Sequence, residues 1–323
     1  MSSAPGQTNV QALLDRADAL AANDARAAMT FYQAALQTAQ ATPPADPQVL
    51  ERLHSAQAFI AGRALEFEQS LDQALAGFVP DDAQGNSRLT HALEMLKGTR
   101  TIYPQEPSVF YYPYLSQRQF FERDEFEWVP ALEAAAPAIR AELLALVEDG
   151  PDFQPYVVDE PNRPHRQFAH LNNDRSWSAL YLWNDSKLVE DVARRCPNTV
   201  AALERVPLTH IGARTPSVLF SRLEPGAHIP AHAGMLNCRL IGHLPLVVPP
   251  GCTLRVGNET REWEQGKTLI FDDSIEHEAR NPTGELRVVL LFDLWRPELS
   301  PAEQTAISNI FSAIDQFQPL PDA

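Results

Sequence analysis

The chain has 323 residues, of which 44% are hydrophobic and 21% are charged, a composition typical of globular proteins. Its net charge is −16 and its pI is about 4.9, so its surface repels phosphate backbones and anionic lipid. We therefore expect neither nucleic acid nor a membrane as a partner. The sequence also lacks any apolar run of about 18 residues that could cross a bilayer.

Cysteine usage and the first residues of the chain favour a reducing compartment. The three cysteines, Cys196, Cys238 and Cys252, are too few for a disulfide framework, and no CxxC pair suggests a zinc site. Residues 1–6 lack the basic and apolar regions of a signal peptide. We expect a cytoplasmic protein.

Helical periodicity dominates the first hundred residues. Apolar side chains recur at helical spacing over residues 8–40, and prolines interrupt the pattern before a third predicted helix, from Pro47 toward Leu75, with Asp46 as its N-cap. Residues 79–87 are predicted to be a linker.

Residues 1–100 are therefore predicted to form a helical, tetratricopeptide-like region. A single unit of this kind cannot bury its apolar face alone. We expect it to pack on the following domain or on a second copy of the chain, which would give a homo-oligomer. A helical cap without a function of its own is the alternative.

Short apolar runs follow one another in the rest of the chain, separated by clusters of Pro, Gly, Asn and Asp. This pattern predicts an antiparallel β sandwich or barrel, with runs at 217–223, 244–248, 268–271 and 287–294. Helices are predicted near 130–148 and 185–195. The fold class is α+β, with a β domain over 105–300 and a C-terminal helix or tail over 301–323.

Histidines are concentrated in the second half of this domain. His228 and His232 are four residues apart, but Pro230 between them argues against a helical zinc pair and favours a position where a loop enters a strand. His277 follows a predicted strand and the acidic turn 272–274.

The spacing of two of these histidines and an arginine indicates a known chemistry. His277 lies 45 residues after His232, and Arg287 lies ten residues further on. Two histidines from different strands can hold non-haem iron and leave positions open for a chelating co-substrate and oxygen. An arginine on the last strand can hold the distal carboxylate of 2-oxoglutarate in a charge-assisted pair.

Spacing alone leaves alternatives open. The usual facial triad needs Asp or Glu two residues after the first histidine, where this chain has Gly234. The histidines could instead be structural groups of a β-barrel, and His228 and His243 could simply satisfy buried polar groups. The acidic turn 272–274 could bind a metal or cap the segment that follows.

From about Phe110 to Leu299 the chain resembles the aspartyl/asparaginyl β-hydroxylase family. The resemblance rests on the order and spacing of several motifs, namely Tyr111-Tyr112-Pro113, Trp177-Ser178, Pro225-Gly226-Ala227-His228, His232-Ala233-Gly234, Asn237-Cys238-Arg239-Leu240, His243-Leu244-Pro245-Leu246, Trp263-Glu264-Gln265-Gly266-Lys267, Phe271-Asp272-Asp273-Ser274 and Asp293-Leu294-Trp295-Arg296. It implies a double-stranded β-helix of the jelly-roll or cupin-like type. That family lacks the carboxylate ligand, whose place water fills, and Gly234 agrees with this.

The resemblance also implies a role for each matching residue. His232 and His277 would be the ligands of Fe(II). Ser221 and Arg287 would hold the distal carboxylate of 2-oxoglutarate, and His243 would lie near its inner carboxylate.

Arg239 would meet the acidic or amide group of the substrate. Where the family usually has a second arginine, two residues further on, this chain has Ile241. The loss of that cation calls recognition of an aspartyl-type substrate into question.

The implied activity is hydroxylation that depends on Fe(II), 2-oxoglutarate and O2, with succinate and CO2 as products. The expected substrate is an aspartyl or asparaginyl residue of a peptide or protein, or a related amino-acid-like molecule. Two alternatives are kept. The same site could act on a small molecule such as a free amino acid or a natural-product intermediate, or the chain could be a non-catalytic helical-plus-cupin interaction protein.

Overall fold

The computed structural model describes residues 10–77, 88–149, 153–158 and 171–317. The chain divides into two compact units, Met1–Arg100 and Thr101–Ala323. Within the described ranges, no helix is both long enough and apolar enough to cross a membrane.

The first unit is helical, as the periodicity predicted. Its helices are α1 (Val10–Ala21), α2 (Ala25–Ala41), α3 (Pro47–Ala74) and α4 (Arg88–Lys97). The predicted N-cap of the third helix is confirmed, because the Asp46 side chain accepts a hydrogen bond from the Gln48 N–H. The linker predicted over 79–87 lies outside the described residues.

Small side chains bring the first three helices close together. Ala17, Ala28, Ala35 and Ala56 are buried in one apolar cluster, to which Leu14 and Leu53 also belong. At its edge, Asp18 accepts a hydrogen bond from Tyr32 Oη at 2.6 Å and pairs with Arg52 Nη2 at 2.6 Å. The apolar stripe of each helix is thus covered at least in part by its neighbours.

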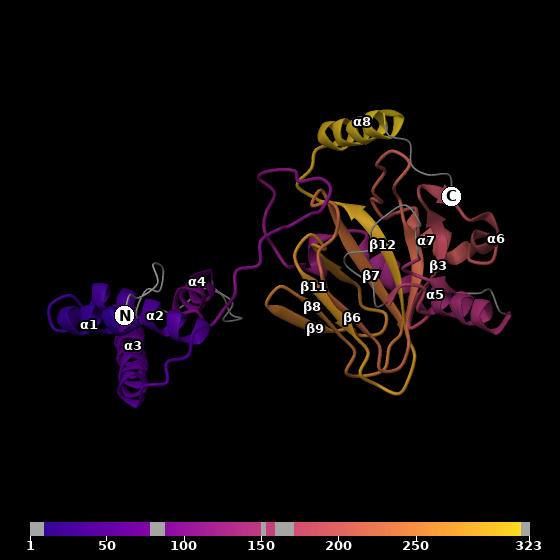
Figure 1. Cartoon of the computed structure of the whole chain (residues 1–323). Coiled ribbons are helices and arrows are strands. Elements are labelled where there is room, and N and C mark those ends of the chain that lie inside the picture. Colours follow the sequence, from indigo (N-terminus) through magenta and orange to yellow (C-terminus); the bar gives the residue numbers. More distant parts are fainter. Residues whose placement is uncertain (1–9, 78–87, 150–152, 159–170, 318–323) are drawn as a thin grey trace. The chain divides into compact units, whose positions relative to one another are not determined.

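The second unit contains two antiparallel sheets (Figure 1). The large sheet has eight strands in the order β1-β10-β7-β12-β5-β3-β2, with β4 paired to β3, and the small sheet has the order β6-β11-β8-β9. The strands are β1 (Phe120–Phe121), β2 (Gln154–Pro155), β3 (Trp177–Asn184), β4 (Lys187–Leu188), β5 (Val218–Leu223), β6 (His228–His232), β7 (Arg239–Val247), β8 (Thr253–Val256), β9 (Glu259–Glu262), β10 (Leu269–Phe271), β11 (His277–Arg280) and β12 (Arg287–Trp295). This arrangement confirms the α+β class and the double-stranded β-helix.

The two faces of the large sheet pack against different apolar clusters. Along β12, Val288, Leu290 and Phe292 pack with α5 (Val129–Asp149) in the largest apolar cluster. The alternate residues of that strand point the other way, and Val289 belongs to a second cluster that both sheets share. Because side chains alternate across a strand, the odd-numbered residues of β12 face the space between the sheets.

The helix predicted over 185–195 is confirmed only over four residues, and its predicted start at Asp185 is wrong. Asp185 and Ser186 have φ values of +47° and +64°, so they form a turn that leads into β4. Only α6 (Glu190–Ala193) is helical in that range, and α7 (Pro197–Leu203) follows it. The apolar residues of this segment pack in the same core as β3. The turn and this packing replace the longer helix that the local sequence favours.

The remaining elements are the 3-10 turn η1 (Arg123–Glu125) and α8 (Pro301–Phe317).

Gly242 of β7 allows a close contact in the large core. A Cβ atom at this position would lie 2.3 Å from Cε2 of Phe292. We expect Gly242→Ala to lower the free energy of unfolding by about 1–3 kcal/mol, as overpacking of a core does. Urea unfolding followed by circular dichroism measures this change.

Gly284→Ala is the matched control, since nothing lies within 4 Å of its Cβ position. Its free energy of unfolding should change by less than about 1 kcal/mol. Equal losses in the two variants would contradict the packing explanation.

Candidate active site

The polar residues singled out by the sequence gather on the surfaces that the two sheets turn toward each other. On β7, Leu240 and Leu244 belong to the largest apolar cluster, so Arg239, Ile241 and His243, which alternate with Leu240, Gly242 and Leu244, face inward. The inward set from the large sheet is Arg239, Ile241 and His243 of β7, Ser221 of β5, and Arg287 and Asp293 of β12. The small sheet contributes the last residue of β6 and the first of β11.

These two residues are His232 and His277. They are direct partners in the β6–β11 ladder, and their ring centroids are 4.0 Å apart. Nδ1 of His232 lies 2.7 Å from the Pro230 carbonyl oxygen, and Nδ1 of His277 lies 3.0 Å from that of Ile275. A carbonyl oxygen only accepts, so each Nδ1 carries the proton and each Nε2 carries a lone pair.

Burial keeps both rings neutral. It lowers the pKa of His232, and it lowers the pKa of His277 further below its ordinary value, with the neighbouring His232 as the next cause. Neutral imidazoles oriented by a carbonyl at Nδ1 are the form in which histidine binds metals. Within the described residues, no group of three or more His, Cys, Asp or Glu side chains could hold a metal. A metal held by these two rings would have no third ligand of these kinds among the described residues.

Arg287 is a buried cation whose neighbours are neutral. It is 1% exposed, and its Nη1 lies 3.4 Å from both the carbonyl oxygen and Oγ of Ser221. Its guanidinium carbon stacks 4.2 Å from the ring centroid of Trp263. Nε has no hydrogen-bond partner among the described residues, and burial lowers the pKa of the guanidinium to about 9. Such a group favours an incoming anion.

His243 has the opposite tautomer to the histidine pair. Trp263 Nε1 donates to His243 Nδ1 at 3.3 Å, so the neutral ring carries its proton on Nε2. Burial, then Arg287 and His277, hold the pKa of His243 well below its ordinary value. The ring therefore offers a hydrogen-bond donor on the side away from Trp263.

Arg239 lies beside two carboxylates that sequence reasoning did not assign to the site. Its Nη2 donates to Asp273 Oδ2 at 3.0 Å. Burial raises the pKa of Asp273 to about 6 and that of Asp293 to about 6, although the charge of Arg239 opposes both shifts. Asp273 Oδ1 is buried and has no hydrogen-bond partner among the described residues.

The structure gives a spatial reason for Gly234. A Cβ atom there would lie 2.1 Å from Asp273 Oδ2, and the glycine does not adopt a positive φ. The Asp273 carboxylate, which comes from the β10–β11 turn, therefore occupies the space that a side chain at position 234 would need. In the sequence, the signal for this carboxylate was the pair of adjacent aspartates in the turn. The side chains of neighbouring residues point in different directions, so one of the two could reach the site.

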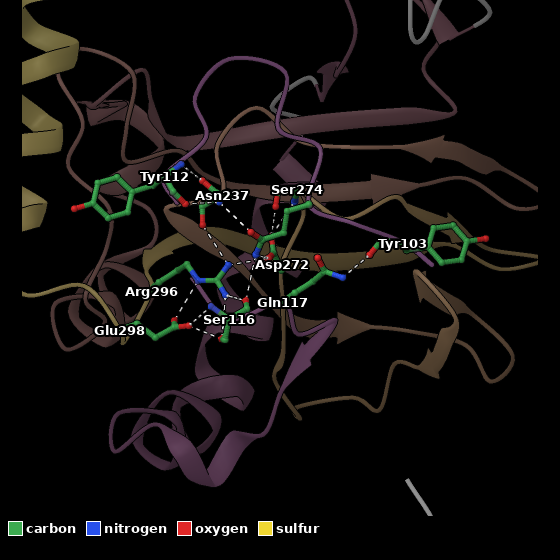
Figure 2. Close-up of polar contacts among 10 residues, drawn as sticks. Tyr103, Tyr112, Ser116, Gln117, Asn237, Asp272, Ser274, Arg296 and Glu298 are labelled. Atoms are coloured by element: carbon green, nitrogen blue, oxygen red, sulfur yellow. Dashed lines mark hydrogen bonds and ion pairs between the residues drawn. The ribbon is translucent and has the colours of Figure 1, made fainter. Parts of the chain in front are cut away.

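The other aspartate of that turn belongs to a buried network (Figure 2). Asp272 Oδ1 accepts from the N–H and hydroxyl of Ser274, which confirms the predicted capping turn. Its Oδ2 accepts from Arg296 Nη1 at 2.7 Å and from Gln105 Nε2 at 2.6 Å. Asn237 Nδ2 donates in turn to Gln105 Oε1 at 3.0 Å. The network joins the turn to the start of β7 and to the segment after β12.

His228 lies outside this site. Its side chain is 40% exposed, and Nε2 lies 2.7 Å from Glu278 Oε2. The structure therefore separates it from the other histidines of the motif, and it is an exposed ion-pair partner rather than a histidine that satisfies a buried polar group.

The fold and this arrangement of histidines define a cupin-like β-helix protein. The family model for aspartyl/asparaginyl beta-hydroxylase matches residues 133–297, just over half of the chain. The chain belongs to that family.

Two similar proteins are named as hydroxylases of different chemical groups. The human aspartyl/asparaginyl beta-hydroxylase is 36% identical over 185 residues, which are 57% of this chain and 23% of that protein. The ornithine lipid ester-linked acyl 2-hydroxylase of Rhizobium tropici is 37% identical over 197 residues, covering 59% of this chain and 65% of that protein. The chain thus matches only part of each of these relatives.

One solved structure with some similarity is the cupin domain of Schizosaccharomyces pombe Cnp3. It is 7% identical, covers 46% of this chain and 74% of that chain, and has a TM-score of 0.26. The strand order of the two sheets defines the fold.

The contact between position 234 and Asp273 can be tested by coupling. Gly234→Ala should displace the Asp273 carboxylate and lower the free energy of unfolding by about 1–3 kcal/mol. In the double variant with Asp273→Ala, most of this loss should disappear, because the colliding group is gone. Urea unfolding of both single variants and the double variant measures the coupling energy. Additive losses would show that the two positions do not compete for space.

Proposed function

We propose that the chain is a hydroxylase dependent on Fe(II), 2-oxoglutarate and O2. The observation that carries the proposal is the pair of neutral imidazoles, His232 and His277, beside a buried arginine that has no carboxylate partner among the described residues. A neutral histidine pair suits a divalent metal, and a buried guanidinium suits a carboxylate. Membership of a hydroxylase family agrees with this combination of a histidine pair and a buried arginine.

The donor set fits iron with an incomplete protein shell. His232 and His277 each offer Nε2, and their Nδ1 protons are engaged by carbonyl groups. Two protein ligands leave positions for a bidentate co-substrate, for oxygen and for water. The unpartnered Oδ1 of Asp273 offers an acceptor to such a water.

The polar groups of the large sheet fit a 2-oxoglutarate molecule. Arg287 and the hydroxyl of Ser221 would bind the distal carboxylate, and the Nε2–H of His243 would donate to the inner carboxylate. When bound, iron with 2-oxoglutarate and O2 supplies the oxidising power for hydroxylation, with succinate and CO2 as by-products. The protein's task is to orient these groups and exclude water, which the apolar side chains of Trp177, Phe271 and Val289 support.

The proposed substrate is an aspartyl or asparaginyl residue of a peptide or protein, or a related amino-acid-like molecule. The names of the human and Rhizobium relatives support hydroxylation but differ in the acceptor. A small-molecule acceptor on the same site is the second candidate, and the Rhizobium name favours keeping it. A non-catalytic role is less favoured, because each predicted contact residue is present and buried or partly buried.

Three further proposals rest on the sequence. The net charge of −16 supports the absence of nucleic acid and membrane partners and is compatible with a cytoplasmic location. Association of the first unit into a homo-oligomer stays a prediction.

The metal assignment predicts a loss of binding. His232→Ala or His277→Ala should weaken Mn(II) or Fe(II) by more than about a hundredfold, since even loss of an outer-shell partner costs about 10–100-fold. Anaerobic calorimetry measures the affinity, and circular dichroism checks that the fold survives. His228→Ala is the matched control, because this histidine pairs with Glu278 outside the site. Full metal binding by either ligand variant would refute the assignment.

The co-substrate assignment predicts a change in KM. Arg287→Ala removes a charge-assisted pair with the distal carboxylate, a contact worth about 1.5–3 kcal/mol. The KM for 2-oxoglutarate, measured by succinate formation, should rise by roughly ten- to a hundredfold. Arg280→Ala removes an exposed arginine of the neighbouring β11 and should leave KM unchanged. An unchanged KM for Arg287→Ala would mean that the carboxylate binds elsewhere.

A further inference from the structure

Arg239 is shared between two buried carboxylates. Its Nη2 donates to Asp273 Oδ2 at 3.0 Å, and the charges of both Asp273 and Asp293 act on it. Asp273 is 6% exposed and Asp293 is 2% exposed, so water screens these charges little. Arg239 is the cation that acts on each of the two carboxylates. One positive charge therefore interacts with two negative charges.

The residue opposite Asp293 explains the imbalance. Ile241 is the direct partner of Asp293 in the β7–β12 ladder, so their side chains are neighbours on the inner face. An isoleucine offers no charge and packs instead in the apolar cluster that both sheets share. Asp293 Oδ1 accepts a hydrogen bond from the Ser217 N–H at 3.0 Å, which orients the carboxylate without neutralising it.

The other inward cation is engaged elsewhere. Arg287 stacks on Trp263 and contacts Ser221, at the place proposed for the distal carboxylate of 2-oxoglutarate. His243 is neutral, because burial and Arg287 disfavour its protonation. A substrate group that reaches Arg239 thus meets a region in which negative charge already exceeds positive charge.

We infer that the substrate group placed beside Arg239 is an amide or an ammonium rather than a carboxylate. A carboxylate would add a third negative charge around one guanidinium in a poorly hydrated place. An amide oxygen can accept from Arg239, while its N–H can donate to Asp273 Oδ1, which has no partner among the described residues. An ammonium would donate to the carboxylates directly. The inference rests on the proposed function, since it takes the substrate to enter beside His232 and His277.

Ile241 is then the residue that sets the charge preference. An arginine at this position would lie opposite Asp293 and could pair with it across the two strands. Arg239 would then have one carboxylate partner fewer and could receive an acidic group. Asp293→Asn would release Arg239 in a different way, by removing the second carboxylate itself.

The experiment compares three probes that differ in one functional group. They are the N-acetyl, C-amide derivatives of aspartate, asparagine and 2,4-diaminobutyrate. Binding is measured by anaerobic calorimetry, with Mn(II) alone and with Mn(II) plus 2-oxoglutarate. The wild-type protein should bind the aspartate derivative at least about tenfold more weakly than the other two, since unbalanced like charges are costly.

Two variants should change this order of affinities, and a control variant should keep it. Ile241→Arg and Asp293→Asn should each strengthen binding of the aspartate derivative by about tenfold or more, and Ile241→Met should retain the wild-type order. Asp293→Asn carries the test by itself if Ile241→Arg fails to fold. A wild-type preference for aspartate, or no discrimination in any of the proteins, including no binding, overturns the inference.

Binding of 2-oxoglutarate in the same calorimeter separates the two proposals. If Mn(II) binds but 2-oxoglutarate does not, the proposed function fails, and the probes with Mn(II) alone still decide the charge preference. If 2-oxoglutarate binds and depends on Arg287, a wrong order of the probes contradicts only the present inference.

Discussion

The ion pair between Arg296 and Asp272 is the contact on which the geometry of the site depends. Both side chains are completely buried, and their atoms are 2.7 Å apart. Removing one partner of such a pair leaves an isolated charge in the interior, which costs about 3–5 kcal/mol. Since Asp272 closes the turn between β10 and β11, the pair fixes where β11 begins, and β11 begins with His277.

The turn therefore serves the scaffold and the site together. Asp272 points toward Arg296 and the surrounding amides, while the next residue, Asp273, points toward Arg239 and Gly234. Gln105 donates to Asp272 and accepts from Asn237, and Arg296 donates further hydrogen bonds to Ser116 and Glu298, so both charges of the pair have additional partners. The turn thus places the Asp273 carboxylate against Gly234, two residues after His232, and against Arg239.

Most of the fold could be predicted because two patterns were clear. The helical spacing of the first hundred residues corresponds to α1 to α3, and the four short apolar runs correspond to β5, β7, β10 and β12. His232 and His277 could be paired from their spacing and from the family resemblance, and the structure makes them direct ladder partners.

The parts of the site that the sequence did not predict depend on contacts between residues that are far apart in the chain. Gly234 reads in sequence as the absence of a ligand, whereas the structure shows a glycine that makes room for Asp273, 39 positions away in the chain. Asp293 appeared only as one letter of a motif, because its position opposite Ile241 requires the register of β7 and β12. The turn at Asp185 and Ser186 was missed because two consecutive residues with positive φ are uncommon where neither is glycine.

The stacking of Arg287 on Trp263 also has a thermodynamic consequence. A free arginine side chain loses about 1.5–2 kcal/mol of rotamer entropy when it becomes fixed. In this protein folding has already fixed it, through the indole ring, Ser221 and nearly complete burial. A dicarboxylate that reaches the guanidinium meets a preorganised partner and orders little of the protein on arrival. Discrimination between acids of different chain length should then arise mainly in enthalpy, because a rigid cation cannot follow a carboxylate that stops short of it.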